Sequence, residues 1–226
     1  MTVNNNIAAD HPNGRLYCTL MEYIKWRVGA VLKTTRLVQT KKHYLENHLA
    51  AEFCLLQLRM CCELLAIGCV AIHTDIPQTS RLKKMWNADL IMKAFEKLKP
   101  EFFPQGSIDE TRPEGLIQQH AAQGAMSKQD FMKAYNLFGG MLHTGTFQHY
   151  ERPSVGRRDF SIIEDFLDKF IKLLNNHVYF LDNNKAMVRI IMNNSKDGRV
   201  AYNYLVGIRI TDSESAAMLS RRDSEA

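Results

Sequence analysis

Two segments carry residue types at a spacing that could do chemistry. The first is segment 57–66, in which Arg59 and Glu63 lie four residues apart among leucine and methionine residues. Residues four apart share one face of a helix, so this arginine and this glutamate can form an ion pair. Charges within an apolar stretch are costly unless they are paired. The pattern therefore has two interpretations, an internal ion pair that fixes helix packing or a polar functional site.

The second segment, residues 135–147, combines two adjacent glycines with a histidine. Gly139 and Gly140 interrupt a helical pattern at a cost of roughly 1 kcal/mol each relative to alanine, so we expect another helix to approach closely here. His143 then falls at the C-terminal end of this helix, where the helix dipole favours a cation. It could hold a phosphate together with the residues of the following loop, or it could simply cap its own helix. The candidate RNA- or phosphate-binding residues of that loop are His149, Arg152, Arg157 and Arg158.

Other functional motifs are missing from the sequence. It has no dinucleotide-binding or phosphate-binding glycine motif, so we expect no cofactor. His143 and His149 lie six residues apart without a third ligand nearby, and no Cys-x-x-Cys pair occurs, so we expect no metal site. We expect the five cysteines to be reduced and largely buried. They are Cys18, Cys54, Cys61, Cys62 and Cys69.

The composition is that of a folded protein of about one domain. The 226 residues are 46% hydrophobic and 23% charged, and 29 basic against 24 acidic residues give a net charge of +5. This mildly basic balance permits a polyanionic partner without requiring one. The longest unbroken apolar run, residues 64–72, is too short to span a bilayer, and the polar start of the chain lacks the features of a signal peptide. We therefore expect a cytoplasmic protein without a membrane partner.

Apolar residues at helical spacing predict most of the elements that position these segments. Helices are expected over residues 15–37, 44–73 and 127–143, with a short helix at 80–86. Asn87 is expected to cap a helix at 88–98 whose Leu90 and Leu98 point inward, and Ser161 with Glu164 forms a capping box for the last helix. Residues 105–126 and 144–159 are expected to be loops, the former with one helical turn near 116–122. Residues 44–73 are apolar nearly all round in their second half, so this helix should be central.

The C-terminal part of the chain changes to a period of two. Residues 186–192 and 199–210 read as strands, and Asp197 with Gly198 between them is a strong hairpin signal. The chain is thus expected to be mainly α, with a helical bundle at 1–181 that includes a loose lead-in at 1–14. A β-hairpin at 182–212 would pack on the bundle or extend it, and a flexible tail would follow at 213–226.

These residues resemble the HEPN superfamily, prokaryotic helical bundles common in defence and toxin–antitoxin systems. The resemblance rests on Leu-Arg-x-x-x-Glu around Arg59 and on Leu-His-x-Gly around His143. It extends to Trp86-Asn-Ala-Asp and to Pro100-Glu-Phe-Phe-Pro. It implies a HEPN-like helical bundle and either RNA or a cognate protein as a partner. We also expect a homodimer.

The sequence departs from the catalytic motif of that superfamily. Active HEPN ribonucleases carry an arginine that is separated from the histidine by four to six intervening residues, but the three candidate positions before His143 are Asn136, Leu137 and Phe138. In metal-independent cleavage, the histidine would handle the 2′-hydroxyl proton and the arginine would steady the phosphate charge. Arg59, with Glu63, would have to serve from another helix.

Three functions follow from these observations. The first is a non-catalytic HEPN-like module that binds RNA or a partner protein, in a defence or toxin–antitoxin setting. The second is a metal-independent endoribonuclease with a rearranged site of Arg59, Glu63 and His143. The third is a structural protein whose C-terminal hairpin adds to the sheet of another chain.

Overall fold

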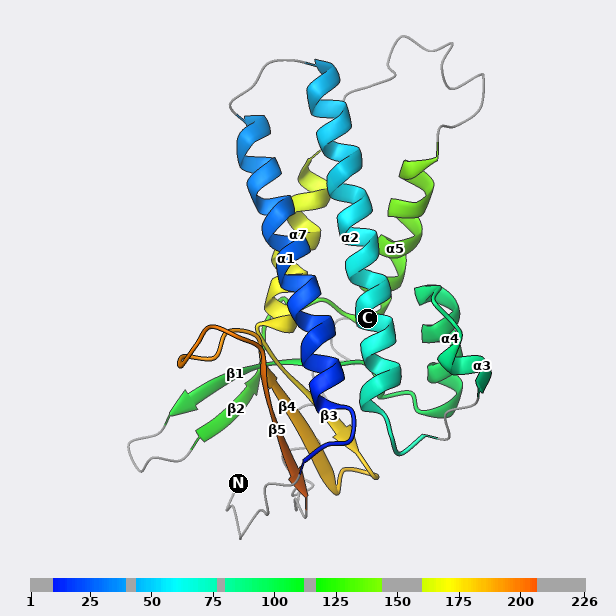
Figure 1. Ribbon diagram of the computed structural model, residues 1–226, viewed down its shortest axis with the longest axis vertical. Coiled ribbons are helices and arrows are strands. Elements are labelled where there is room, and N and C mark those ends of the chain that lie inside the picture. The colour runs from blue at the N-terminus through cyan, green and yellow to red at the C-terminus, as the bar shows by residue number, and fades with distance from the viewer. Residues whose placement is uncertain (1–9, 40–43, 77–79, 112–116, 144–159, 207–226) are drawn as a thin grey trace.

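The computed structural model describes residues 10–39, 44–76, 80–111, 117–143 and 160–206. Four long helices form an elongated bundle, and a small sheet lies at one end of it (Figure 1). The bundle consists of α1 (Gly14–Gln39), α2 (Tyr44–Ile72), α5 (Lys128–Leu142) and α7 (Ser161–Leu174). Two shorter helices, α3 (Ser80–Lys83) and α4 (Ala88–Leu98), lie beside the sheet-proximal half of α2. The chain is therefore mainly helical, as the sequence predicts.

The central position of α2 explains its composition. Its second half is buried on nearly every face, and it contacts α1, α4 and α5. Residues Asn47–Ile72 are long and apolar enough to cross a membrane, with a mean hydropathy of 1.8 over the best window. In the fold, 61% of that window is buried inside the protein, which is the pattern of a core helix.

Local capping signals set the start of two helices. The side chain of Asn87 accepts a hydrogen bond from the backbone N–H of Leu90, and Ser127 Oγ accepts one from the N–H of Asp130. The start of α7 differs from the prediction, because Phe160 occupies the N-cap position and makes no side-chain capping bond.

The inward face of α4 is narrower than the sequence predicts. Ile91 and Phe95 are buried, whereas Leu90 is 53% exposed and Leu98 is 58% exposed. Both leucines lie beside the buried stripe, on a helix that is covered on one side only, so the prediction that they point inward is wrong.

The sheet has five antiparallel strands in the order β2-β1-β3-β4-β5. The predicted hairpin is confirmed: β4 (Ala186–Ile191) pairs with β5 (Ala201–Val206). The sequence did not reveal the central strand β3 (Asn176–Leu181), which directly follows α7 and pairs with β4 along its whole length.

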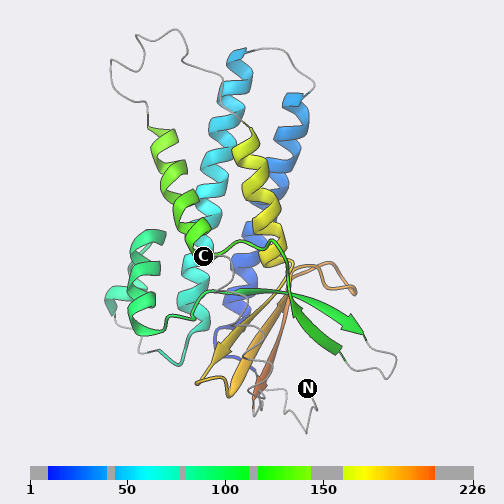
Figure 2. The same cartoon turned by 180° about the vertical axis from the view of Figure 1, so that it is seen from behind.

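The remaining two strands correct the expected loop at 105–126. In its place, β1 (Gln105–Thr111) and β2 (Ile117–Ala121) form a hairpin that projects away from the bundle (Figure 2). The helical turn expected near 116–122 is therefore wrong. Only Gln105 and Gly106 of β1 pair with β3, so most of this hairpin extends beyond the rest of the sheet.

Polar contacts join the connection between β4 and β5 to α1. Lys25 donates hydrogen bonds to the backbone carbonyls of Met192 and Gly198, while Glu22 accepts one from the N–H of Val200. The turn between β4 and β5 contains Gly198 at a positive φ of 69°, which only glycine adopts without strain. The predicted hairpin thus packs on the bundle through α1.

Candidate functional site

Arg59 and Glu63 meet as predicted, and they meet Tyr135 as well. On α2, Nε of Arg59 lies 3.5 Å from a carboxylate oxygen of Glu63. From α5, the Tyr135 hydroxyl donates to Glu63 at 3.2 Å and accepts from Nη2 of Arg59 at 3.0 Å. The guanidinium carbon also lies 4.3 Å from the centre of the tyrosine ring. The three side chains therefore join α2 to α5 through a closed set of contacts, which we call the Arg59 cluster.

The solvent exposure of the three side chains determines the protonation state and the accessibility of the Arg59 cluster. Tyr135 is buried, whereas the side chains of Arg59 and Glu63 each keep about a quarter of their surface exposed, 24% and 23%. Burial raises the pKa of Tyr135, and the neighbouring Glu63 charge raises it further, partly offset by Arg59. The tyrosine is therefore a neutral hydrogen-bonding group, and the arginine charge is already balanced by a carboxylate.

One of the two adjacent glycines has the close contact that the sequence predicts. A Cβ on Gly139 would collide with Nη1 of Arg59, whereas a Cβ on Gly140 would meet nothing within 4 Å. The close approach at Gly139 involves an arginine side chain, and Gly140 has no packing reason to be glycine. Tyr135 lies four residues before Gly139, on the same helix face, and this spacing is the sequence signal that could have identified it.

His143 lies at the C-cap of α5 with an extended backbone, and its side chain is exposed. It follows Gly139 by one helical turn, roughly 6 Å along the axis. Within the described residues, His143 forms no hydrogen bond or ion pair with Arg59 or Glu63. The phosphate-binding candidates His149, Arg152, Arg157 and Arg158 lie outside the described residues.

A second polar cluster, which the sequence did not reveal, lies buried between the bundle and the sheet. The Tyr17 hydroxyl lies 2.7 Å from Nε2 of His177 and 2.9 Å from the Tyr179 hydroxyl, which in turn lies 3.7 Å from Sγ of Cys69. Nδ1 of His177 is 2.9 Å from the carbonyl of Leu174. A neutral imidazole protonated at Nδ1 satisfies all of these contacts, because Nδ1 then donates and Nε2 accepts.

Burial sets the protonation states in this cluster. It lowers the pKa of His177 to about 4 and raises that of Cys69 to about 12. Burial also raises the pKa of both tyrosines. Every member is therefore neutral near pH 7, and none is reachable by solvent. The cluster fastens the sheet to the bundle and is closed to substrates.

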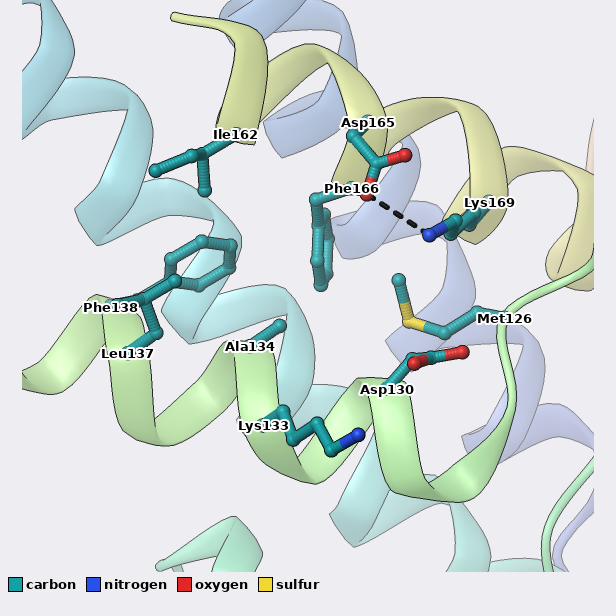
Figure 3. Close-up of a pocket in the computed structure, with 10 residues that line it drawn as sticks. All are labelled: Met126, Asp130, Lys133, Ala134, Leu137, Phe138, Ile162, Asp165, Phe166 and Lys169. Atoms are coloured by element: carbon teal, nitrogen blue, oxygen red, sulfur yellow. Dashed lines mark ion pairs between the residues drawn. The ribbon is translucent and has the colours of Figure 1, made fainter. Parts of the chain in front are cut away.

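Helices α5 and α7 border a shallow groove of about 190 Å³ (Figure 3). Phe138 and Phe166, whose ring centres are 4.9 Å apart, lie on its floor. Charged groups lie at the rim, including the Asp165–Lys169 ion pair at 3.1 Å. The groove therefore offers apolar surface between charged side chains. Its other lining residues are Met126, Asp130, Lys133, Ala134, Leu137 and Ile162.

Several exposed basic and aromatic residues lie on α3, on α4 and in the segment between them. Trp86 is 64% exposed and lies four residues before the exposed Leu90, while Lys83 and Lys84 end the preceding segment. Lys97 lies on the same helix face as Leu90, seven residues further on. We call Lys83, Lys84, Trp86 and Lys97 the α3–α4 surface. In the described part of the chain, none of its three lysines forms an ion pair.

The described residues contain no group of three or more histidine, cysteine or acidic side chains that could hold a metal. All five cysteines are free thiols; four are buried and Cys18 is partly exposed. Comparison with family models, curated proteins and solved structures gave no match. The HEPN resemblance therefore stays a prediction.

Proposed function

We propose that the protein is a non-catalytic, HEPN-like helical module that binds single-stranded RNA through the α3–α4 surface. The observation that carries the proposal is the exposed Trp86, which closely follows the exposed Lys83 and Lys84 in the chain, with the exposed Lys97 in the last turn of α4. Within the described residues, these three lysines form no ion pair. Proteins that bind single strands combine aromatic rings, on which bases stack, with cations that track the phosphates. The HEPN resemblance adds a cytoplasmic role in prokaryotic defence to this proposal, for example as part of a toxin–antitoxin pair.

The state of Arg59 supports binding without cleavage. An arginine that stabilises phosphate charge must be free to meet the substrate, whereas Arg59 is engaged by Glu63 and Tyr135. His143 is exposed one helical turn beyond Gly139 and takes no part in this cluster. This arrangement favours a packing role for Arg59 over a catalytic one.

Fluorescence anisotropy with a labelled single-stranded RNA in EDTA tests the proposal. We expect salt-dependent binding, without new RNA fragments on a denaturing gel. Trp86→Ala and the double variant Lys83→Glu/Lys84→Glu should each weaken binding by about tenfold, since one stacked base contributes roughly 1–3 kcal/mol. Lys196→Glu, an exposed lysine in the β4–β5 turn, is the matched control and should bind normally.

Two results would overturn the proposal. If the wild-type protein does not bind RNA, or if the α3–α4 variants bind as well as Lys196→Glu, this surface is not an RNA site. Cleavage in EDTA that His143→Ala abolishes would instead identify a metal-independent ribonuclease.

A further inference from the structure

We infer that α1 and α2 form the interface between two copies of this chain. These helices lie side by side (Figure 1). Together they expose seven large apolar or aromatic side chains, of which Leu16 lies at the very start of α1 and the other six lie further along the two helices. The α1–α2 face consists of Tyr23, Trp26 and Leu37 on α1 and Leu49, Phe53 and Leu56 on α2, which are 41–68% exposed. This surface is separate from the α3–α4 surface, and the inference does not depend on RNA binding.

The six side chains form one continuous face. Arg27 of α1 donates a 2.6 Å hydrogen bond to Gln57 of α2, which marks the seam between the helices. Tyr23 lies one turn from Arg27, while Phe53 and Leu56 flank Gln57 on the exposed side of α2. The apolar groups therefore continue from one helix to the other across this seam.

The spacing on α1 is that of a helix which packs against another helix. Tyr23, Ala30 and Leu37 follow one another at intervals of seven residues, and Trp26 comes three after Tyr23. Residues seven apart lie on one side of a helix, so these residues form an apolar stripe, with the charged Lys33 seven residues after Trp26 at its edge. The stripe lies on an outward face, because the buried α1 side chains are on the other side of the helix: Tyr17, Met21, Ile24, Val31 and Thr35.

The area of the face suits a dimer. At roughly 200 Å² for a fully exposed large side chain, the six exposed fractions amount to about 600 Å² of surface. A standard interface buries roughly 800 Å² on each partner, of which little more than half is apolar. The α1–α2 face is therefore large enough to supply the apolar part of one such interface.

Charge complementarity selects the partner and the geometry. Beside the face, α1 carries the exposed Lys33 and α2 carries Glu52, which is 38% exposed. Other charges of the two helices are engaged elsewhere, with Lys25 bound at the β4–β5 turn and Glu63 bound to Arg59. A two-fold axis across the helices would place α1 against the α1 of the other copy, with like charges facing. An axis parallel to the helices places α1 against α2 of the other copy, with opposite charges facing. The second arrangement is the one we propose.

This arrangement predicts a specific contact between copies. Because α1 and α2 run in opposite directions from the Arg27–Gln57 contact, Lys33 lies about level with residues 51–52 of α2. Rotation about an axis parallel to the helices does not change the height of a residue along that axis. Lys33 of one copy should therefore meet Glu52 of the other. Within its own chain, Glu52 pairs with His48 at 3.1 Å, and its side chain remains 38% exposed.

Sedimentation equilibrium of the full chain across a wide concentration range tests the inference. The wild type should have twice the mass of one chain. Trp26→Glu and Leu49→Glu should each raise the dimer dissociation constant by at least about tenfold, since each buries a charge in the interface. Leu98→Glu, at an equally exposed leucine on α4, is the control and should remain dimeric.

Charge reversal tests the geometry. Lys33→Glu and Glu52→Lys should each weaken the dimer, and the double variant should recover most of the loss. Circular dichroism of each variant shows whether the helices remain folded. A monomeric wild type, a dimer insensitive to Trp26→Glu and Leu49→Glu, or a double variant no better than the single ones would overturn the inference.

Discussion

Gly139 of α5 lies against the guanidinium of Arg59 on α2, so closely that a methyl group at this position would collide with Nη1. The neighbouring Gly140 has open space. Two adjacent glycines with the same local cost therefore have different reasons to be present. Comparing the stability of alanine variants at the two positions therefore measures how much the Arg59 cluster contributes to the packing of α2 against α5.

We predict that alanine substitutions will separate the two glycines. Gly140→Ala should raise the free energy of unfolding by about 0.5–1 kcal/mol, because alanine is the better helix former. Gly139→Ala gains the same helix propensity, but its methyl group displaces Arg59 from Glu63 and Tyr135. It should therefore be less stable than Gly140→Ala by about 1–2 kcal/mol.

Urea denaturation of the two variants measures this difference. In an Arg59→Ala background the collision disappears, so Gly139→Ala should then stabilise as much as Gly140→Ala does. Equal effects of the two substitutions in the wild-type background would contradict the observed contact.

The Tyr135 hydroxyl should contribute to stability through the same cluster. Tyr135→Phe keeps the ring beside the guanidinium but removes the bonds to Nη2 of Arg59 and to Glu63. We expect a loss of about 1 kcal/mol in the free energy of unfolding, measured with urea. The loss should shrink when Arg59 is already alanine; an unchanged loss would show that the hydroxyl acts independently of the arginine.

The elements that the sequence predicts well are those with a strong local pattern. Helices α1, α2 and α5 carry apolar residues at helical spacing, and Asp197 with Gly198 marks the turn of the β4–β5 hairpin. The Arg59–Glu63 pair was predictable for the same reason, since a spacing of four residues on one helix decides it. Tyr135 reaches the pair from a helix more than seventy residues away, so its spacing of four residues from Gly139 was the one sequence signal that pointed to it.

The strands that were missed lack a local signal. β3 begins directly after Asn175, the C-cap of α7, and is buried on both faces, so its apolar residues do not alternate with polar ones as those of a half-exposed strand would. β1 and β2 are rich in polar residues and pair mainly with each other, away from the core. Their pairing depends on a neighbouring strand and on the shape of the hairpin, neither of which appears in a short sequence window.

The Tyr17 hydroxyl should be one of the more costly polar groups to remove. It is fully buried and lies between His177 and Tyr179, so Tyr17→Phe leaves both partners short of a hydrogen bond. We expect thermal unfolding to show a loss of about 1–3 kcal/mol. A Tyr17→Phe variant as stable as the wild type would show that the buried contacts contribute nothing.

His177 makes the attachment of the sheet dependent on pH. Burial lowers its pKa from 6.5 to about 4, so between these values the unfolded chain binds a proton that the folded chain does not. The stabilisation is fully present above pH 6.5 and is lost as the pH falls toward 4. The loss attributable to this residue should be about 3 kcal/mol.

Urea denaturation at a series of pH values measures this dependence. His11, whose pKa burial also lowers, adds to the same slope, so the comparison must be made against a variant at position 177. His177→Gln keeps a donor and an acceptor in the cluster but cannot titrate. Its stability should fall less steeply between pH 6.5 and 4 than that of the wild type. A variant with the wild-type slope would show that His177 does not cause the acid sensitivity.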